Sequence, residues 1–591
     1  MGRCEGSEHE SKRRRIRVTT IDEDEELREA LAEQDDQYDP ELGMLETPFS
    51  GGPGYHTTLE DVETVHPTSG SLNYAVSLLG LEDPDADERA FTIIRKVLSL
   101  QDRDEDNDTY GIWPWYYEEP LEEMDPPDWN WADFCGERLV IAAGKHDRIP
   151  DDLADDIESS VRAACEAIIE RDVDIGYTNI AIVGAFVTLR AGELYDWESV
   201  HEYGLDRLQR FADHTRRFDT FEEYNSPPYT TTAIRGLSTI ETLSTTPEAV
   251  ELSADLLDTA WKTIAEHFHP TTQQWAGPHF RAYSSLLGDG RRTFIQLGTD
   301  GAVQLVSDEE INYDPRLYWI DLKCPERYYE EFREPDEDWL FQPYQETETG
   351  VRKHASTYLT EEYCLGTFDK EVMWNQRRNL LAYLSNDGDP AYVHLRFLKD
   401  DYDYASAVFT SAHDRNAALF GIDFSTDGGD THLHFDPTEG SIDCEDLRLR
   451  FEVGGAVGGT DVDIARHDDG TETASISFPD HEITARSLAT ELDWEPEGWT
   501  IDRTDEEIHV DYVLYEGDER TFDFTDIDRA ALVFAFAVSD PSLVDAATRT
   551  DGDGTVGAAL ELSDSRLDLS IGTTPATEDE LFEGNETDVE R

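Results

Sequence analysis

Apolar residues recur with helical spacing through the first half of the chain, from about residue 70 to 300. Two stretches show the spacing of three and four that buries one face of a helix: Ala90, Ile93, Ile94, Val97 and Leu98, and then Leu153, Ile157, Val161, Ala164 and Ile168. Further helical runs lie near 130–144, 177–194, 198–214, 228–244 and 248–268. Seven helices with short links predict antiparallel helical hairpins packed side by side as an incomplete or closed α/α toroid. A helical-repeat solenoid is the alternative, but the chain shows no fixed sequence period.

After about residue 340 the apolar period changes from 3.6 to 2. Leu447, Leu449 and Phe451 alternate with charged residues, which predicts a half-buried strand, whereas 532–537 is wholly apolar and predicts a buried one. Similar strands are expected at 391–398, 405–410, 473–478, 508–515 and 567–571, separated by turn signals such as Asn386-Asp387-Gly388. Many strands without intervening helices predict an antiparallel β-sandwich.

These patterns predict an α+β multidomain protein. An acidic, mostly irregular extension covers 1–65, the (α/α) toroid domain covers 66–335, the antiparallel β-sandwich domain covers 336–573, and a disordered tail covers 574–591. The 591 residues support this division, because a single hydrophobic core seldom grows beyond about 250 to 300 residues.

The net charge indicates the kind of environment in which the protein works. With 48 Lys and Arg against 132 Asp and Glu, the formal charge is -84, which is typical of a halophile's solvated surface. The basic run Lys12 to Arg15 precedes no apolar signal segment and is interpreted as a disordered end rather than a nucleic-acid site. No apolar stretch is long enough to span a membrane, so we expect a cytoplasmic protein. Six scattered cysteines form no CxxC pair and predict neither a metal site nor disulfides.

Candidate chemistry is concentrated in three aromatic clusters. The first, 111–131, is rich in Trp and Tyr, whose flat faces suit sugar rings while neighbouring polar groups hold hydroxyls. Its candidate binding residues are Trp113, Trp115, Tyr116, Trp129 and Trp131. The alternative is structural, since aromatic loops also plug the ends of helical barrels.

The second and third clusters supply amide, phenol and imidazole groups. Tyr224, Asn225 and Tyr229 precede or open a helix, where unpaired N–H groups attract carboxylates, and Asn179 has a similar position one hairpin earlier. An ordinary helix cap is the structural alternative. In 277–283, alternation would place His279, Arg281 and Tyr283 on one side of an extended segment, giving a proton carrier, a cation and a phenol.

Two further features complete the candidate set. His354 lies at the predicted domain junction, where it could complete a site or serve as a core histidine. Carboxylate pairs such as Glu118 with Glu119, or Glu222 with Glu223, could serve a glycosidase, although pairs arise by chance in so acidic a chain. The chain has no Walker loop, no GxGxxG after a strand, no GxSxG and no HExxH, which argues against the chemistries those motifs support.

This order of parts, a helical hairpin domain, a cleft bearing Tyr, Asn and His, and a long β domain, resembles the heparinase II/III-like and alginate-lyase-like polysaccharide lyases over about 70–570. The resemblance implies β-elimination of uronate-containing glycans. An Asn or His neutralises the uronate carboxylate, a Tyr or His removes the C5 proton, and a Tyr protonates the departing O4 oxygen. The matching residue types here are Asn225, His279, Tyr229 or Tyr283, and His354. Such elimination needs no cofactor, and none is expected.

Three functions therefore remain open: an oligosaccharide or polysaccharide lyase, a six-hairpin-type glycoside hydrolase with a carboxylate pair near Glu118 to Asp125, and a non-catalytic carbohydrate-binding or scaffold protein. The expected partner is a carbohydrate, with an acidic glycan favoured if local arginines such as Arg235, Arg281, Arg377 and Arg378 decide binding.

The charge of the chain leads to a prediction about salt. At an ionic strength of ~1 M the Debye length falls to about 3 Å, so repulsion among surface carboxylates is screened. We expect the thermal unfolding midpoint to rise steadily as KCl increases from about 0.1 M to 2 M. Scanning calorimetry across that range measures it, and a flat or falling midpoint would contradict a halophile's surface.

Overall fold

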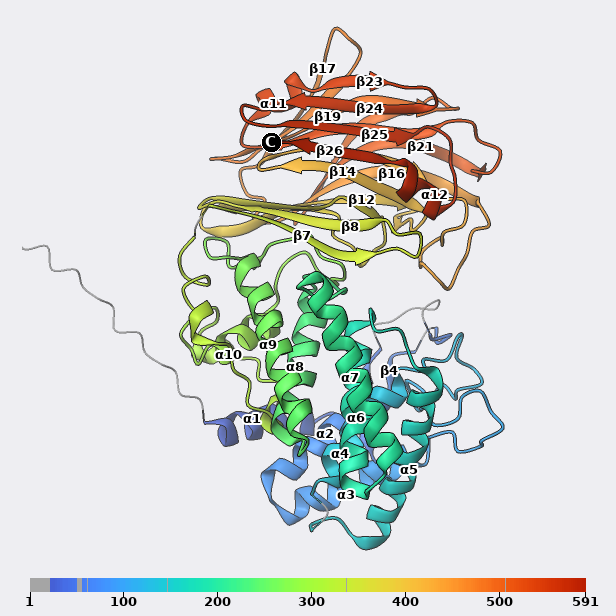
Figure 1. Cartoon of the computed structure of the whole chain (residues 1–591), viewed down its shortest axis with the longest axis vertical. Helices are drawn as coiled ribbons and strands as arrows, with labels where there is room; N and C mark the ends of the chain where they lie inside the picture. Colours follow the sequence, from blue (N-terminus) through green and yellow to red (C-terminus); the bar gives the residue numbers. More distant parts are fainter. Residues whose placement is uncertain (1–21, 50–55, 61, 146, 336, 505) are drawn as a thin grey trace, which may run out of the picture.

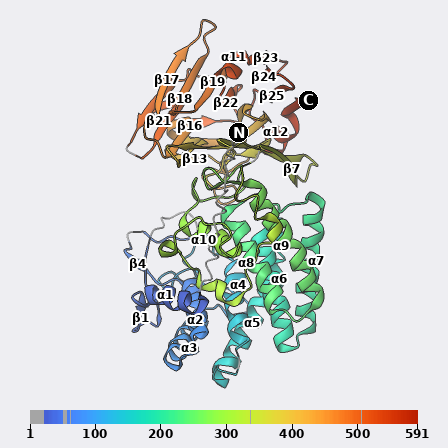
Figure 2. The ribbon, with the colours of Figure 1, turned by 90° about the vertical axis from the view of Figure 1, so that its left-hand side faces the viewer.

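The structure is a computed structural model that describes residues 22–49, 56–60, 62–145, 147–335, 337–504 and 506–591. Cys4 and the basic run at 12–15 lie outside these ranges. A helical domain (blue to green) and a domain of stacked sheets (yellow to red) lie end to end in Figure 1, and Figure 2 shows the same arrangement after a quarter turn. The predicted toroid followed by an antiparallel β-sandwich is confirmed in its main architecture.

The helical domain is a set of hairpins with an inner and an outer layer. Consecutive helices pair as α2 with α3, α4 with α5, α6 with α7 and α8 with α9, while α2, α4, α6 and α8 also pack against one another. The bounds are α1 Glu23–Asp35, α2 Thr68–Leu78, α3 Pro84–Leu98, α4 Trp131–Ala143, α5 Asp151–Arg171, α6 Thr178–Tyr195, α7 Glu198–Phe218, α8 Pro227–Leu243, α9 Pro247–His267 and α10 Asp289–Gly298. Short 3-10 helices are η1 Leu79–Leu81, η2 Asp308–Glu310, η3 Pro315–Trp319 and η4 Glu326–Tyr328.

Sequence decides which helix takes which layer. The inner helix α6 is buried on nearly every side, since almost all of 178–192 is apolar or small. The outer helices α3 and α7 are amphipathic, with one apolar stripe against the core and charged residues toward solvent. An inner ring that is apolar all round and an outer ring that is apolar on one face are what a two-layered toroid requires.

Helix starts follow the expected local chemistry at most positions. Asp83 caps α3 by accepting from the backbone N–H groups of its first turn, and Ser226 does so for α8, whose first two residues are prolines. Thr246 is the N-cap of α9, although its side chain makes no capping bond. Asn130 is the N-cap of α4, and Asp128 Oδ1 accepts from the Asn130 backbone N–H at 3.0 Å.

The β domain contains two large antiparallel sheets. The larger has the order β20-β21-β16-β12-β11-β9-β8-β7, with β13 paired to β12, and the other has the order β10-β14-β15-β22-β19-β18-β17. Their bounds are β7 Asp338–Glu346, β8 Arg352–Leu359, β9 Tyr363–Phe368, β10 Lys370–Val372, β11 Leu380–Asn386, β12 Asp389–Lys399, β13 Tyr402–Asp403, β14 Ala407–Asp414, β15 Ala417–Phe424, β16 Ser441–Gly455, β17 Asp461–Arg466, β18 Glu472–Ser477, β19 Glu482–Leu492, β20 Gly498–Arg503, β21 Ile508–Asp523 and β22 Ala530–Val538. Their inner faces share one core, which includes Leu447, Leu449 and Phe451 of β16.

A third sheet lies behind the second one. It has the order β23-β24-β25-β26, from β23 Thr548–Asp551, β24 Thr555–Glu561, β25 Arg566–Gly572 and β26 Glu586–Glu590, and the short helices α11 Pro541–Ala546 and α12 Glu578–Gly584 lie beside it. This explains the wholly apolar run of β22. Leu532, Phe534 and Phe536 face the sandwich core, while Val533 and Ala535 face the core under the third sheet.

Both chain ends contain more structure than the sequence interpretation assigned. The segment 574–591, interpreted as a disordered tail, forms α12 and β26, because Leu581 and Phe582 are buried and Val589 packs under the third sheet. Within the extension 1–65, α1 forms and buries Leu27 and Leu31, and short strand pairs join β1 Tyr38–Asp39 to β2 Met44–Leu45 and β3 Thr47–Pro48 to β4 Thr64–Val65. The few apolar residues that hold these segments in place stand among many acidic ones, so the sequence pattern did not reveal them.

The segment that follows α9 connects the two domains. After the small pair β5 Phe268–His269 and β6 Gln274–Trp275, the chain runs along the large sheet, where Thr357 Oγ1 donates to the carbonyl of Gly277 at 2.7 Å. Gly366 on β9 permits the close approach, since a Cβ there would lie 1.9 Å from the Gly277 carbonyl oxygen. Farther along, His279 and Arg378 form a backbone bridge.

In the part of the chain that the structure describes, no helix is both long and apolar enough to cross a membrane. Cys135, Cys165, Cys324, Cys364 and Cys444 are buried thiols without disulfide partners there.

Candidate active site at the domain junction

A cavity of about 750 Å³ opens where the helical domain meets the large sheet, and we call it the junction cleft. The helical domain contributes Trp115, Trp129, Trp131, Arg171, Tyr177, Asn179, Glu223, Tyr229, Arg281 and Tyr283. The β domain contributes Gln345, Lys353, Glu371, Trp374, Arg377, the loop 432–435 and Glu578. Aromatic faces and polar side chains therefore meet in one space, as a carbohydrate site requires.

Three tryptophans form one wall of the cleft. Trp115 and Trp131 stack with ring centroids 5.1 Å apart. Their indole N–H groups are held by Asp128 Oδ2 at 3.1 Å and Thr68 Oγ1 at 3.0 Å, and that of Trp129 by the carbonyl of Asp108 at 3.1 Å. Because each N–H has a protein partner, the rings are held in place, and all three remain partly exposed where they line the cleft.

Two phenols meet in the lining of the same cleft. Tyr229, in the first turn of α8, shares a short hydrogen bond between hydroxyl groups with Tyr283, which is 64% exposed. The guanidinium of Arg281 lies 4.1 Å from the centroid of the Tyr229 ring. Burial raises the pKa of Tyr229, although Arg281 acts against that rise, so the phenol holds its proton at neutral pH. Tyr229 can therefore donate a proton and be reprotonated from solvent through Tyr283.

Glu223 organises the groups around this pair. Its Oε1 lies 3.2 Å from Arg281 Nη1, while its Oε2 accepts from the side-chain amide of Asn179 at 2.8 Å and from the Asn179 backbone N–H at 2.9 Å. The carboxylate thus caps the positive end of α6 and holds Arg281 in place. Asn179 Oδ1 is buried and has no partner among the described residues, so it remains available to a ligand hydroxyl.

Glu371 anchors the β-domain side. Arg377 Nε, Lys353 Nζ and Tyr344 Oη lie 3.1, 3.2 and 2.9 Å from its carboxylate oxygens. Burial alone would raise the pKa of Glu371, but the two cations and the phenol hold it at about 2. The guanidinium of Arg377 also lies 3.5 Å from the centroid of the Phe280 ring and donates to the Phe280 carbonyl. This network therefore connects the β domain to residues 276–283, which we call the junction segment.

The loop 432–435 brings two histidines into the cleft. His432 stacks on Phe435 at 4.1 Å, and its Nδ1 accepts from the backbone N–H of His434 at 3.2 Å. Burial and the neighbouring His434 lower the pKa of His432 to about 4, and burial together with Arg377 lowers that of His434. Both rings are therefore neutral at pH 7 and can accept a proton. The sequence analysis did not select them, although the run His-Leu-His-Phe in an acidic, Gly-rich loop was a usable signal.

The structure places ten of the residues named from the sequence in the junction cleft. They are Trp115, Trp129, Trp131, Asn179, Glu222, Glu223, Tyr229, Arg281, Tyr283 and Arg377. Two other aromatic candidates lie elsewhere. Trp113 is fully buried and donates to the carbonyl of Val97, so it belongs to the core. Tyr116 packs edge-on against Phe49 outside the cleft.

Three polar candidates lie beneath the cleft wall instead of in it. Asn225 has a positive φ of 47°, a conformation that Asn tolerates, and its amide donates to the carbonyls of Ala276 and Pro278. His279 Nδ1 bonds the Asn225 carbonyl at 2.6 Å, and burial lowers the pKa of that ring to about 3. Tyr224 is buried, with its hydroxyl 2.8 Å from His267 Nε2. These groups satisfy buried polar atoms and shape the junction segment.

His354 also lies apart from the junction cleft. It pairs with Asp369 at 2.9 Å, stacks on Phe341 and lines a separate cavity of about 930 Å³ within the β domain. That cavity is larger, and Trp339 and Asn585 are in its lining, but no tyrosine is among its described lining residues. The carboxylates Glu118 and Glu119 are outside the cleft as well, bound to His66 and to Thr57 and Thr58 respectively.

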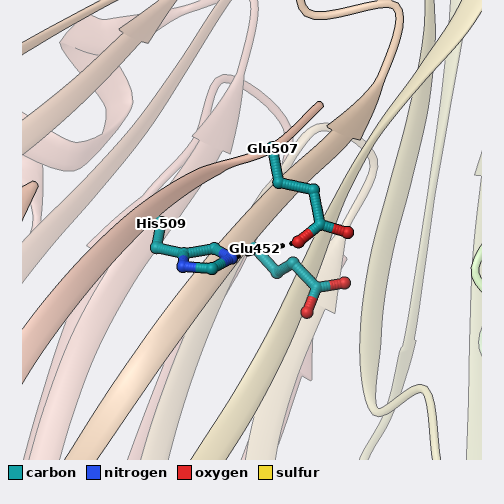
Figure 3. A group of neighbouring side chains, drawn as sticks. All are labelled: Glu452, Glu507 and His509. Carbon is teal, nitrogen blue, oxygen red and sulfur yellow. Dashed lines mark hydrogen bonds and ion pairs between the residues drawn. The ribbon is translucent and has the colours of Figure 1, made fainter. Parts of the chain in front are cut away.

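One cluster in the described residues has the composition of a metal site. Glu452, Glu507 and His509 lie close together on the large sheet, with their ligand atoms within 4.8 Å of one another (Figure 3). Glu452, however, already accepts from Arg396 Nη1 at 2.7 Å and from the hydroxyl of Tyr392 at 3.1 Å. A cation this close neutralises the carboxylate, so the donor set does not fit a divalent ion.

Part of the helical domain matches a known family model. A family model described as a domain of unknown function (DUF8769) matches residues 25–289. No curated protein matches the chain. Among solved structures, the chain is similar to the Streptomyces coelicolor A3 chondroitin AC lyase in complex with chondroitin sulphate, at 11% identity, a TM-score of 0.41, and coverage of 93% of this chain and 89% of that chain.

A second similar structure is a chondroitinase AC lyase studied through oligosaccharide complexes and mutagenesis, at 7% identity, a TM-score of 0.39, and coverage of 92% of this chain and 90% of that one. These two structures are chondroitin lyases, which are polysaccharide lyases like the heparinase-like and alginate-lyase-like enzymes of the sequence resemblance. Similarity at this level assigns neither residue roles nor a substrate. The class that the fold itself defines is an α/α toroid joined to an antiparallel β-sandwich.

The Glu371 network generates a prediction about stability. Because the pKa of Glu371 is depressed, its contribution is complete above the ordinary carboxyl value of about 4.3 and is lost as pH falls toward about 2. We expect Glu371→Gln to lower the free energy of unfolding by about 3 kcal/mol at pH 7, since it leaves Lys353 and Arg377 buried without their anion.

Urea unfolding at constant salt from pH 7 to pH 3 measures this difference. The gap between wild type and variant should narrow below about pH 4.3. Glu361→Gln, at an exposed position of the same domain, should change little. A gap that is small at pH 7, or that widens in acid, would contradict the assigned ion pairs.

Proposed function

We propose that the protein is a carbohydrate-active enzyme that binds an oligosaccharide or polysaccharide in the junction cleft and cleaves uronate-containing chains by β-elimination. The observation that carries this proposal is the hydroxyl pair of Tyr229 and Tyr283 beside Arg281, in a cleft that three tryptophans also line. A protonated phenol near a cation and a sugar platform supplies the acid that an elimination requires at the departing oxygen.

Substrate binding would use the faces of Trp115 and Trp131 for the sugar rings and the side chain of Asn179 for a hydroxyl. The uronate carboxylate needs a cation. Arg281 is paired with Glu223 and Arg377 with Glu371, whereas Arg171 at the rim donates to the amide oxygen of Asn130 at 2.6 Å. Arg171 is therefore the cation best placed to receive a substrate anion. High salt would screen the long-range repulsion from the net charge of -84.

The proposed reaction removes one proton from C5 of the sugar and adds one proton to the departing O4 oxygen. A neutral histidine, for which we propose His434, takes the C5 proton. The electrons of the broken C5–H bond form the C4–C5 double bond as the C4–O4 bond breaks. Tyr229 gives its proton to the departing O4 oxygen and recovers one through Tyr283 from solvent. His434 is preferred over His432, whose Nδ1 already accepts a backbone hydrogen bond.

Tyr229→Phe tests the acid. It removes one hydroxyl and keeps the ring under Arg281, so we expect uronate-polymer cleavage to fall at least about 100-fold with the fold intact. Absorbance of the unsaturated product in molar KCl measures it, across glycosaminoglycan, alginate and pectin substrates. Tyr402→Phe, at an exposed tyrosine outside the cleft, is the matched control. Full activity in Tyr229→Phe, or no unsaturated product from wild type on any polymer, would refute the proposal.

The pH profile tests the base. A base with a lowered pKa stays unprotonated below the ordinary histidine value of about 6.5, so kcat/KM should hold through pH 6 and fall only at lower pH. His434→Gln should lose most activity, while His432→Gln should retain more of it. A profile that falls already between pH 8 and pH 7 would exclude this assignment.

Glycoside hydrolysis is the second candidate function. Its carboxylate pair would be Glu371 and Glu578 instead of the pair expected near Glu118 to Asp125. Glu371 is held ionised, whereas burial and the nearby Glu371 raise the pKa of Glu578 in the same cleft. Carboxylates whose pKa values are pushed apart are what an acid and base pair needs. New reducing ends without unsaturated product would favour hydrolysis, and sugar binding without either product would favour a binding protein.

A further inference from the structure

We propose that the helical domain contains a second ligand site, a binding site for a small inorganic oxyanion such as phosphate or sulfate, formed by Arg235, Arg291 and Arg316. The site lies in a cavity of about 300 Å³ between α8, α10 and the segment 312–317. That cavity and the junction cleft have no lining residue in common. The inference is therefore independent of the function proposed for the cleft.

The charges around this cavity do not balance. Arg316 is matched, because its Nε and Nη2 lie 2.8 and 2.6 Å from the two oxygens of Asp314. Asp314 is the one carboxylate among the described residues that line the cavity, and it is paired with Arg316. Three guanidinium groups thus share one carboxylate. In a chain with 132 acidic and 48 basic residues, such a local excess of cations is not a product of composition.

Arg235 shows most clearly that a partner is missing. The residue is only 8% exposed, it projects from the inner helix α8, and its Nε has no hydrogen-bond partner in the described part of the chain. Burial and the neighbouring Arg316 lower the pKa of Arg235 to about 9. A buried cation without an anion is costly, and a bound anion would remove that cost.

Among the described residues, a neighbouring buried arginine has the partners that Arg235 lacks. Arg138 pairs with Glu137 and donates to Asn73 Oδ1. Both Arg235 and Arg316 also face the small space beside Arg138, which is too narrow for a ligand. The open space lies on the other side, toward Arg291 and Asn312.

The donor set favours an oxyanion over a monatomic ion. Guanidinium groups present planar, paired N–H donors that match the oxygens of phosphate, sulfate or carboxylate. Tyr313, which lines the same cavity and is 6% exposed, adds a buried hydroxyl without a partner among the described residues. Several donors of different type converge on a space of ligand size, which is how proteins bind such anions.

Thermal unfolding and calorimetric titration test this site with the whole protein in KCl at constant ionic strength. We expect phosphate or sulfate, but not additional chloride, to raise the unfolding midpoint of wild type. Arg235→Met should weaken binding roughly 10- to 100-fold, the range for charge-assisted hydrogen bonds. Arg291→Met, at a less buried position, should weaken it as well. Arg415→Met makes the same charge change far from the cavity and should leave binding unaltered.

Stability without oxyanion separates a ligand site from a structural cluster. If the cavity awaits an anion, Arg235→Met should be as stable as wild type, or more stable, in chloride alone, because it removes an unmatched buried cation. A variant that is less stable than wild type in chloride would overturn the inference. The inference would also be overturned if wild type bound neither phosphate nor sulfate, or if both arginine variants bound the anion as tightly as wild type. The response to phosphate against that to sulfate identifies which anion the site prefers.

Discussion

The contact between the junction segment and the large sheet is the constraint on which the candidate site depends. The chain after α9 runs against β8 and β9, where Thr357 binds the Gly277 carbonyl and Gly366 leaves room for it. Arg377 then holds Phe280 through its carbonyl and its ring. These contacts fix the backbone before Arg281, and after it the Ala282 N–H donates to the carbonyl of Gln376 at 2.7 Å, so that Tyr283 meets Tyr229.

Buried charge in this molecule follows a different rule from surface charge. The surface carries the acid excess, whose mutual repulsion depends on salt. In the cleft, carboxylates such as Glu223 and Glu371 are paired with specific cations and serve as fixed points that orient Arg281, Asn179 and Arg377. Within the described part of the chain, Arg235 lacks such a carboxylate partner, and this led us to infer a bound anion.

Periodicity predicted the fold well because it reports burial directly: the inner helices, the outer helices and β22 can be recognised from their apolar patterns. The site was only partly predictable. Tyr229, Arg281 and Tyr283 were found because they lie in short aromatic clusters, but Glu371 and His434 come from distant segments that only the tertiary fold brings close. Asn225 and His279 were wrongly placed in the site, because a polar side chain that hydrogen-bonds a buried backbone carbonyl looks the same in the sequence as one that binds a ligand.

The central claim is that the junction segment creates a single sugar-binding cleft between the domains. A crystal structure of the protein with a uronate oligosaccharide, grown in high salt, tests it most directly. The account predicts sugar rings against Trp115 and Trp131, with a glycosidic oxygen within hydrogen-bond reach of the Tyr229 hydroxyl. Sugar bound instead in the β-domain cavity beside His354, with the junction cleft empty, would contradict it.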